Sequence, residues 1–281
     1  MHAAVTARDD HRAGVLAFLG EVAIPGFVVG IGGGLPAFVA LDSGRPASAQ
    51  DSNSTAVREH PLIRPIKYAR AAQARIRAFA DYEATFTKKE AIERRLQSST
   101  MRVRIRHAPF SVFMEYIDPH KGRQVSYVKG QNDGKLHVKQ TGLMRVIGTL
   151  TLSPDDPRAM KDNRHPITSM GIDRSVEKVI QRWELESKYG EIDVKYYGNA
   201  VIRNPEGDIA CRVIESSHPR PRRQFEFQKT RLYLRKSDNL PIRIEHFAFP
   251  LQEGDKSPLV EQYTYTKIKT NRGFTDRDFS F

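Results

Sequence analysis

The chain has 281 residues, of which 39% are hydrophobic, a fraction that is low but sufficient for a folded core. Lysine and arginine number 45 against 33 aspartates and glutamates, so the formal net charge is +12. The single cysteine, Cys211, excludes an intramolecular disulfide and a cysteine-based metal site. It lies in an alternating segment, which indicates a small core residue.

The first fifth of the chain differs from the rest. Residues 22–41 contain no charged side chain and are followed by Ala47-Ser48-Ala49, an arrangement typical of a secretory signal peptide. We therefore predict that residues 1–49 are a signal peptide or N-terminal hydrophobic segment, and that the mature protein is periplasmic or secreted. The alternative is an uncleaved segment that anchors the protein to the membrane, because about twenty uncharged residues just span a bilayer.

Residues 50–60 are polar and predict a flexible N-terminus of the mature chain. From there the pattern predicts a single domain over residues 61–281. Residues 62–78 predict a basic amphipathic helix, because apolar or small side chains recur at helical spacing at Leu62, Ile66, Ala69, Ala72 or Gln73, and Ile76. We expect this helix to pack on a sheet; binding to a membrane surface is the alternative.

Short alternating segments then predict strands around residues 82–87, 101–106, 112–116, 125–127, 136–138 and 144–152. The charged segment 88–95 separates the first two, and Asn132-Asp133-Gly134 predicts a hairpin turn. Residues 153–171 are turn-rich and polar, which indicates either a functional surface or a partly ordered insertion. A second helix is predicted from residue 172 to residue 189, with one apolar stripe formed by Ile172, Val176, Val179, Ile180 and Trp183.

The rest of the chain predicts strands at residues 194–197, 209–215, 225–235, 242–249 and 262–269. Two of these form a hairpin over residues 231–249, in which Leu232 and Leu234 alternate with Arg231, Tyr233 and Arg235. The element order predicts the α+β class, with a strongly curved antiparallel sheet and helices on one face.

No catalytic or metal-binding motif is present in the sequence. Six histidines outside the N-terminal region form no short-spaced ligand pair with one another, namely His107, His120, His137, His165, His218 and His246. Asp155-Asp156 and the pair Asp276 and Asp278 are candidate metal ligands or acid–base groups, but Asp155-Asp156 precedes Pro157 and fits a turn better, and a catalytic role is not favoured for either pair. We therefore predict no catalytic residue, no metal and no cofactor.

Basic side chains gather on alternating segments and in one loop. Alternation places most of them on a solvated outer face of the sheet. Arg220, Arg222 and Arg223 are the best candidates for contact with an anion, because two prolines stiffen the loop that carries them. An exported protein rarely meets nucleic acid, and no stacking-rich recognition motif is present, so we predict no nucleic-acid partner.

The inward-facing positions predict either a packed core or the lining of an apolar pocket, since a strongly curved sheet under a few helices leaves room for a ligand. The candidate lining residues are Tyr82, Phe86, Val103, Ile105, Val112, Met114, Tyr116, Leu232, Leu234, Ile242 and Ile244.

About residues 70–281 resemble a bacterial domain-of-unknown-function family, number 1571, in the segments RVRIRHAPFSVFMEYIDPHKGRQVSYVKGQNDGKLHV, PRAMKDNRHPITSMGI and HPRPRRQFEFQKTRLYLRKSDNLPIRIE. At the level of the fold, the chain also resembles the Lol-type periplasmic lipoprotein carriers, in the segments LYLRKSDNLPIRIEHF and QYTYTKIKTNRGFTDRDFSF. The second resemblance implies that the curved sheet forms an incomplete β-barrel, covered by helices over an apolar cavity. The resemblance to family 1571 implies no activity, because that family has no established one. Neither resemblance identifies individual site residues in this chain.

We therefore expect a cell-envelope protein, not an enzyme, that binds or carries a lipid or the acyl chain of a lipoprotein in a half-barrel cavity, with transient membrane contact. One alternative is an envelope interaction module that binds anionic glycan or protein through basic loops. A second, less favoured one is an exported hydrolase that uses acidic residues and His165 in the segment 153–171.

Overall fold

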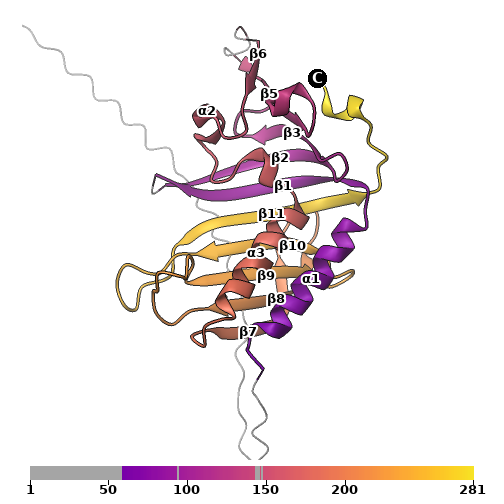
Figure 1. Cartoon of the computed structure of the whole chain (residues 1–281). Coiled ribbons are helices and arrows are strands. Elements are labelled where there is room, and N and C mark those ends of the chain that lie inside the picture. The colour runs from indigo at the N-terminus through magenta and orange to yellow at the C-terminus, as the bar shows by residue number, and fades with distance from the viewer. Residues whose placement is uncertain (1–58, 94, 143–145, 147) are drawn as a thin grey trace, which may run out of the picture.

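The computed structural model of the chain describes residues 59–93, 95–142, 146 and 148–281. The predicted signal peptide and most of the predicted flexible N-terminus lie outside these residues. One antiparallel sheet contains all eleven strands, in the order β6-β5-β4-β3-β2-β1-β11-β10-β9-β8-β7 (Figure 1). Because β6 and β7 stand at opposite edges and do not pair, the sheet stays open. The predicted α+β fold with a curved antiparallel sheet, an incomplete barrel, is confirmed.

The strands are β1 (Asp81–Ile92), β2 (Arg95–Arg106), β3 (Ser111–Asp118), β4 (Gln124–Val128), β5 (Leu136–Lys139), β6 (Thr149–Leu152), β7 (Asp193–Ile202), β8 (Ile209–Ser217), β9 (Lys229–Arg235), β10 (Pro241–Phe247) and β11 (Leu259–Thr270). The helices are α1 (Ile63–Arg77), α2 (Pro157–Met160) and α3 (Ile172–Glu186), with short 3-10 turns η1 (Asn132–Gly134), η3 (Ile167–Ser169) and η4 (Asp276–Phe279). None of the helices among the described residues is long and apolar enough to cross a membrane.

The two long helices form the predicted cover on one face of the sheet. α1 packs against α3, and α3 packs on β10 (Figure 1). Both predicted stripes are buried, and Trp183 of α3 is fully buried, where its indole Nε1 donates a hydrogen bond of 2.9 Å to Ser216 Oγ on β8. The spacing of apolar residues was sufficient to identify these two helices because each needs only one buried face.

The first hairpin is longer than the sequence predicted. The charged segment 88–95 is not a connection: β1 runs to Ile92 and β2 begins at Arg95, with Ile92 paired to Arg95. Alternation continues through the charges, so Phe86, Lys88 and Glu90 are all buried on the inner face. Charged side chains continue a strand here because a buried lysine and a buried glutamate neutralise each other.

The predicted hairpin over residues 231–249 is confirmed, with Leu232 of β9 opposite Ile244 of β10. Its outer face is less exposed than predicted. Arg231 Nε lies 2.5 Å from Glu215 Oε2, and the Tyr233 hydroxyl donates to Glu245 Oε2 at 2.9 Å. These long side chains cover one another, so the outer face of β8, β9 and β10 is a half-buried layer of paired charges rather than a solvated surface.

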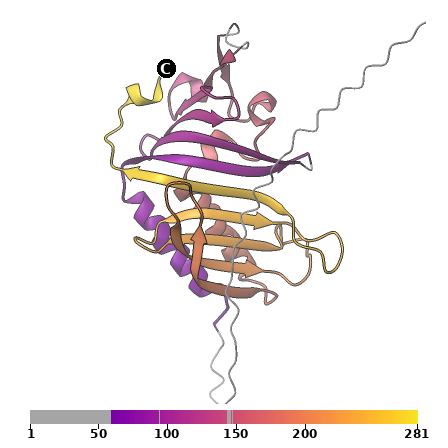
Figure 2. The same ribbon diagram turned by 180° about the vertical axis from the view of Figure 1, so that it is seen from behind.

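The connection between β7 and β8 also covers this outer face. It bends across the back of the sheet, where Glu206 of the connection pairs with Lys267 of β11 (Figure 2). At the other end of the sheet the C-terminal turn η4 is fixed by an ion pair of 2.6 Å between Asp276 and Arg106 and by the buried ring of Phe279. Asp276 therefore has a structural partner.

Candidate ligand-binding cavity

A cavity of about 580 Å³ lies between the inner face of the sheet and the segment that leads into α3. The sheet contributes side chains from β1 to β6 and from β10 and β11, and the segment 153–171 contributes α2, η3 and their flanks. Much of the wall is apolar or aromatic: Phe86, Met101, Met114, Tyr116, Val125, Leu136, Val138, Leu150, Leu152, Ile167, Met170, Ile244 and Tyr265. The volume falls within the range of about 300 to 1,000 Å³ typical of small-molecule pockets.

The eleven candidate lining residues divide into two groups. Four of them line the cavity: Phe86, Met114, Tyr116 and Ile244. The other seven are buried in the packed core: Tyr82, Val103, Ile105, Val112, Leu232, Leu234 and Ile242. The core group includes Tyr82, whose hydroxyl accepts a hydrogen bond from the Ile172 backbone N–H at 2.9 Å, and which is therefore covered by the start of α3. The alternation of side chains along a strand shows which residues point inward. It does not show whether a helix packs on them or whether they line a cavity.

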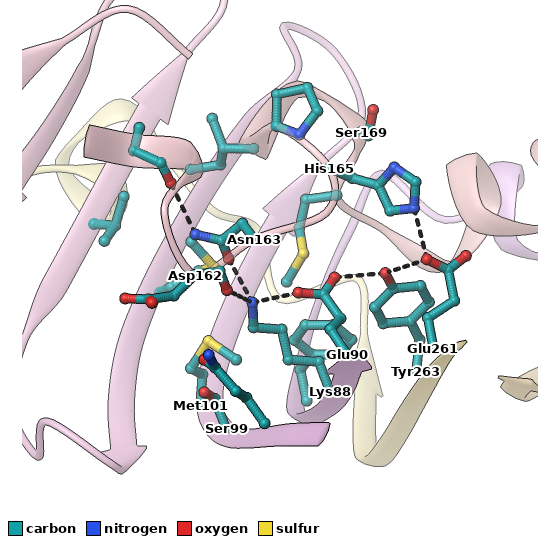
Figure 3. Close-up of a pocket in the computed structure, with 18 of the residues that line it drawn as sticks. Lys88, Glu90, Ser99, Met101, Asp162, Asn163, His165, Ser169, Glu261 and Tyr263 are labelled. Atoms are coloured by element: carbon teal, nitrogen blue, oxygen red, sulfur yellow. Dashed lines mark hydrogen bonds and ion pairs between the residues drawn. The ribbon is translucent and has the colours of Figure 1, made fainter. Parts of the chain in front are cut away.

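One end of the cavity is polar. We define the polar cluster as seven side chains: Lys88, Glu90, Asn163, His165, Glu261 and Tyr263, which Figure 3 shows together, and Arg164, which donates to Glu261. They come from β1, from β11 and from the segment 153–171, which is thereby attached to the inner face of the sheet. The strand members were not predicted from the sequence, although continued alternation from Phe86 through Lys88 to Glu90 would have placed the two β1 members inward.

Lys88 is the centre of the attachment. Its ammonium donates to Glu90 Oε2 at 2.8 Å, to the Asp162 backbone carbonyl at 2.8 Å and to Asn163 Oδ1 at 2.5 Å (Figure 3). The Lys88 and Glu90 side chains are only 10% and 4% exposed. Three acceptors satisfy all three N–H donors of a lysine, which compensates for its removal from water. The segment 153–171 is therefore an ordered part of the cavity wall and not a loosely attached insertion.

Two carboxylates share the other side of the cluster. Glu90 and Glu261 are cross-strand partners, and the Tyr263 hydroxyl lies 2.6 Å from Glu90 Oε1 and 3.1 Å from Glu261 Oε2. Burial, followed by the charges of both carboxylates, raises the Tyr263 pKa far above its ordinary value. The Tyr263 hydroxyl therefore stays protonated and donates to these carboxylates. This donor, together with Lys88 and Arg164, allows Glu90 and Glu261 to lie side by side on neighbouring strands.

Glu261 is ionised in spite of its burial. Burial alone would raise its pKa, but the hydrogen bonds from His165 at 3.0 Å and from Arg164 at 2.9 Å lower it to about 2. His246, next to it on β10, stacks on Phe227 with ring centroids 4.3 Å apart. Burial disfavours the imidazolium form and lowers the His246 pKa to about 3, although the Glu261 charge opposes this.

These shifts predict that acid destabilises the protein. Between pH 6.5 and about 3 the unfolded chain protonates His246 while the folded chain does not, so stability is complete above pH 6.5 and falls as the pH is lowered. Below about pH 4.5 Glu261 adds a further loss in the same direction. We expect His246 to account for a decrease of roughly 2 kcal/mol in the free energy of unfolding between pH 7 and pH 5.

Urea unfolding at several pH values measures this dependence. The variant His246→Gln keeps a polar group for Thr230 but does not titrate, so its free energy of unfolding is expected to change less between pH 7 and pH 5 than that of the wild type. If the free energy of unfolding changed equally with pH in both proteins, the pH dependence could not be assigned to His246. Because His246 Nε2 and Glu261 Oε1 are only 3.8 Å apart, the two contributions are coupled and do not add.

The hydrolase alternative depends on His165, which the structure pairs with Glu261. Within the described residues no hydroxyl group forms a hydrogen bond with the His165 ring, and no group of three or more metal-ligating side chains is present. Glu261 also binds Arg164 and Tyr263, so this carboxylate stabilises the polar cluster. Asp156 serves the structure as well: it caps α2 by accepting from the Arg158 backbone N–H at 2.9 Å.

The three anion-contact candidates lie away from the cavity, between β8 and β9. Arg220, Arg222 and Arg223 are all exposed. Arg222 donates two hydrogen bonds, of 3.0 and 2.8 Å, to the carboxylate of Glu191. Arg220 and Arg223 have no ion pair among the described residues. Their contact with an anion stays a prediction.

Comparisons with known proteins give similar structures at low identity. Lipoprotein LppX from Mycobacterium tuberculosis is 11% identical, with 75% of this chain and 96% of that chain covered and a TM-score of 0.41. A LolA superfamily protein from Nitrosomonas europaea is 13% identical, with 76% of this chain and 96% of that chain covered and a TM-score of 0.32. An uncharacterized conserved protein from Thermus thermophilus is 10% identical, with 78% of this chain and 93% of that chain covered and a TM-score of 0.41. Likenesses at this level carry no functional argument.

No similar protein was found among curated protein sequences. The family described as "Protein of unknown function (DUF1571)" matches residues 79–281, which is more than half of the chain. This match confirms the resemblance that the three sequence segments indicated. The chain belongs to the DUF1571 family of proteins of unknown function.

Proposed function

We propose that this protein binds or carries an apolar ligand, a lipid or the acyl chain of a lipoprotein, inside the cavity of its half-barrel. The observation that supports this function is the cavity of about 580 Å³ itself, with its wall of methionine, aliphatic and aromatic side chains. Natural cores are close-packed and leave few voids larger than a water molecule. A space of this size therefore favours a binding site over a packing defect.

The energetics of such a ligand need no covalent chemistry. At about 30 Å³ for each water-sized group, the cavity holds roughly twenty such groups, which fits one long acyl chain better than a complete diacyl lipid. Each buried methylene contributes about 0.8 kcal/mol, so a dozen contribute on the order of 10 kcal/mol before the costs of ordering the chain. Flexible methionine side chains at Met101, Met114 and Met170 adapt to chains of different shape.

The proposed location is the cell envelope, reached through the predicted signal peptide of residues 1–49. Outside the cytoplasm a lipid must cross water between membranes, and a protein cavity shields its chain from water during that step. Retention of residues 1–49 as an anchor is the alternative; intact mass measurement of the exported protein distinguishes the two, because cleavage removes these residues.

Native mass spectrometry tests the function directly. Protein purified from the envelope fraction without detergent is expected to carry an additional mass equal to one acyl-chain compound, which organic solvent releases for identification. A protein that stays free of ligand after exposure to lipid vesicles and to acylated peptide would contradict the proposal. Binding that disappears at high salt and does not depend on an acyl chain would instead favour the interaction module with anionic glycan or protein.

A further inference from the structure

A second hollow, of about 490 Å³, adjoins the cavity at α3. All nine residues that line it have polar or charged side chains, whereas apolar and aromatic side chains form much of the cavity wall. Ser169 and Lys178 line both spaces, so the two adjoin at these side chains. An apolar chamber next to a polar one is the arrangement that an amphiphile requires, with its chain in one and its head group in the other.

The polar hollow contains two cations that lack a carboxylate partner. Arg174 and Lys178 are four residues apart on α3 and therefore lie on the same side of the helix, where like charges repel. Neither forms an ion pair within the described part of the chain. Of the two acids that line the hollow, Glu177 is bound by Arg77 at 2.6 Å and by Gln73, and Asp173 Oδ1 lies 3.9 Å from His107 Nε2. The repulsion between Arg174 and Lys178 is thus left for a bound anion to relieve.

The surroundings hold both cations in place. The Arg174 guanidinium lies over the ring of Phe110 at 3.8 Å from its centroid, which fixes its plane. Lys178 is half-buried, and burial lowers the pKa of its ammonium below the ordinary value, so the site disfavours the charge when no anion is bound. An anion in contact with Lys178 would reverse this effect.

Three buried polar atoms of the hollow have no hydrogen-bond partner among the described residues: Arg174 Nε, His107 Nε2 and Asp173 Oδ1. Only 8% of the surface of Asp173 is exposed. His107 Nε2 and Asp173 Oδ1 lie 3.9 Å apart and face each other, so these two atoms do not require a ligand. Arg174 Nε requires an acceptor, and an anionic group beside the guanidinium would compensate for its burial.

We propose that this hollow binds the head group of the amphiphile whose chain occupies the cavity, and that the head group is an anionic phosphodiester. Phosphate oxygens accept from Arg174 and Lys178. The charges agree with this choice: Arg77, Arg174 and Lys178 against Asp173 and Glu177 leave one positive charge for one negative phosphodiester. The inference rests on the proposed function for the position of the chain.

Binding of chain-matched probes below their critical micelle concentrations tests the inference by calorimetry. The probes are 1-palmitoyl-lysophosphatidylglycerol, neutral 1-monopalmitoylglycerol, and glycerol phosphate without a chain. We expect the anionic lysolipid to bind about tenfold more tightly than the neutral monoacylglycerol, because one charge-assisted hydrogen bond is sufficient for that ratio. Glycerol phosphate alone is expected to bind much more weakly than either, since it lacks the chain.

Lys178→Gln is expected to lower the affinity for the lysolipid about tenfold and to lower the affinity for the neutral probe much less, since that probe has no charge for Lys178 to contact. Lys178→Arg is expected to restore most of the loss because it keeps the charge. Lys188→Gln is the matched control: it removes a lysine just beyond the same helix and outside both spaces. Urea unfolding verifies that Lys178→Gln folds with wild-type stability.

Each outcome decides one of the two proposals. Equal affinity of wild type for the anionic and the neutral probe would overturn the head-group inference while leaving the proposed function intact. Equal affinity for glycerol phosphate and the lysolipid would also overturn it, because the hollow would then bind a small anion independently of any chain. Failure of both acyl probes to bind would instead contradict the proposed function.

Discussion

Val138→Phe is expected to reduce the affinity for an acyl ligand by about thirtyfold without lowering the stability of the protein. Val138 lies on β5 and lines the cavity. The larger ring enters space that the ligand needs, and the loss of room for two or three methylenes costs roughly 2 kcal/mol of binding. The free protein has space for the added atoms, so no core side chain has to move. Calorimetry with an acyl probe and urea unfolding measure the two quantities.

The matched control is Val112→Phe. Val112 is fully buried on β3, in the packed core and outside the cavity lining. The same substitution overpacks this position and is expected to cost about 1 to 3 kcal/mol of stability. If Val138→Phe were as destabilising as Val112→Phe, the wall at Val138 would be packed and the cavity would not exist in solution.

Lys88→Met is expected to destabilise the protein by about 3 to 5 kcal/mol, because it leaves the buried Glu90 carboxylate without its cation. The substitution also removes the donors for the Asp162 carbonyl and for Asn163 Oδ1. We therefore expect the segment 153–171 to detach from the sheet before the rest unfolds. Hydrogen exchange of its backbone amides, compared with those of α1, would show this as faster exchange confined to the segment.

Two further variants separate the buried charge from the lysine itself. Lys88→Met combined with Glu90→Gln is expected to recover part of the stability, because glutamine still accepts from Tyr263 but carries no charge. Arg102→Met removes one partner of the exposed pair with Glu115 and is expected to cost about 0.5 kcal/mol or less. Equal losses for Lys88→Met and Arg102→Met would contradict the role assigned to the polar cluster.

Local patterns were sufficient for most of the elements. The two long helices, the turn at Asn132–Gly134 and the hairpin of β9 and β10 were identified because each has a period or a turn residue of its own. The charged part of the first hairpin was assigned to a connection, since Lys88 and Glu90 are unfavourable inward residues when each is considered alone. Only their contact with each other, and with the segment 153–171, makes that position stable.

The candidate site was predicted in part for a similar reason. Alternation places Phe86 and Tyr82 on the same face of β1, yet Phe86 lines the cavity and Tyr82 lies beneath the start of α3. The period of a strand specifies the direction of a side chain but not what covers it. The polar hollow was not predicted, because Arg174 and Lys178 belong to a helix of which only the apolar stripe was assigned from the sequence.

The sequence by itself determined most of the helices and strands, the antiparallel connection of neighbouring strands, and the membership of the family. These depend on short-range spacing and turn chemistry, which a linear chain displays directly. The tertiary structure alone decided where the core ends and the cavity begins, and which charges are paired. Both depend on contacts between segments far apart in the chain: Lys88 with Asn163, Glu261 with His165, and α3 with β10.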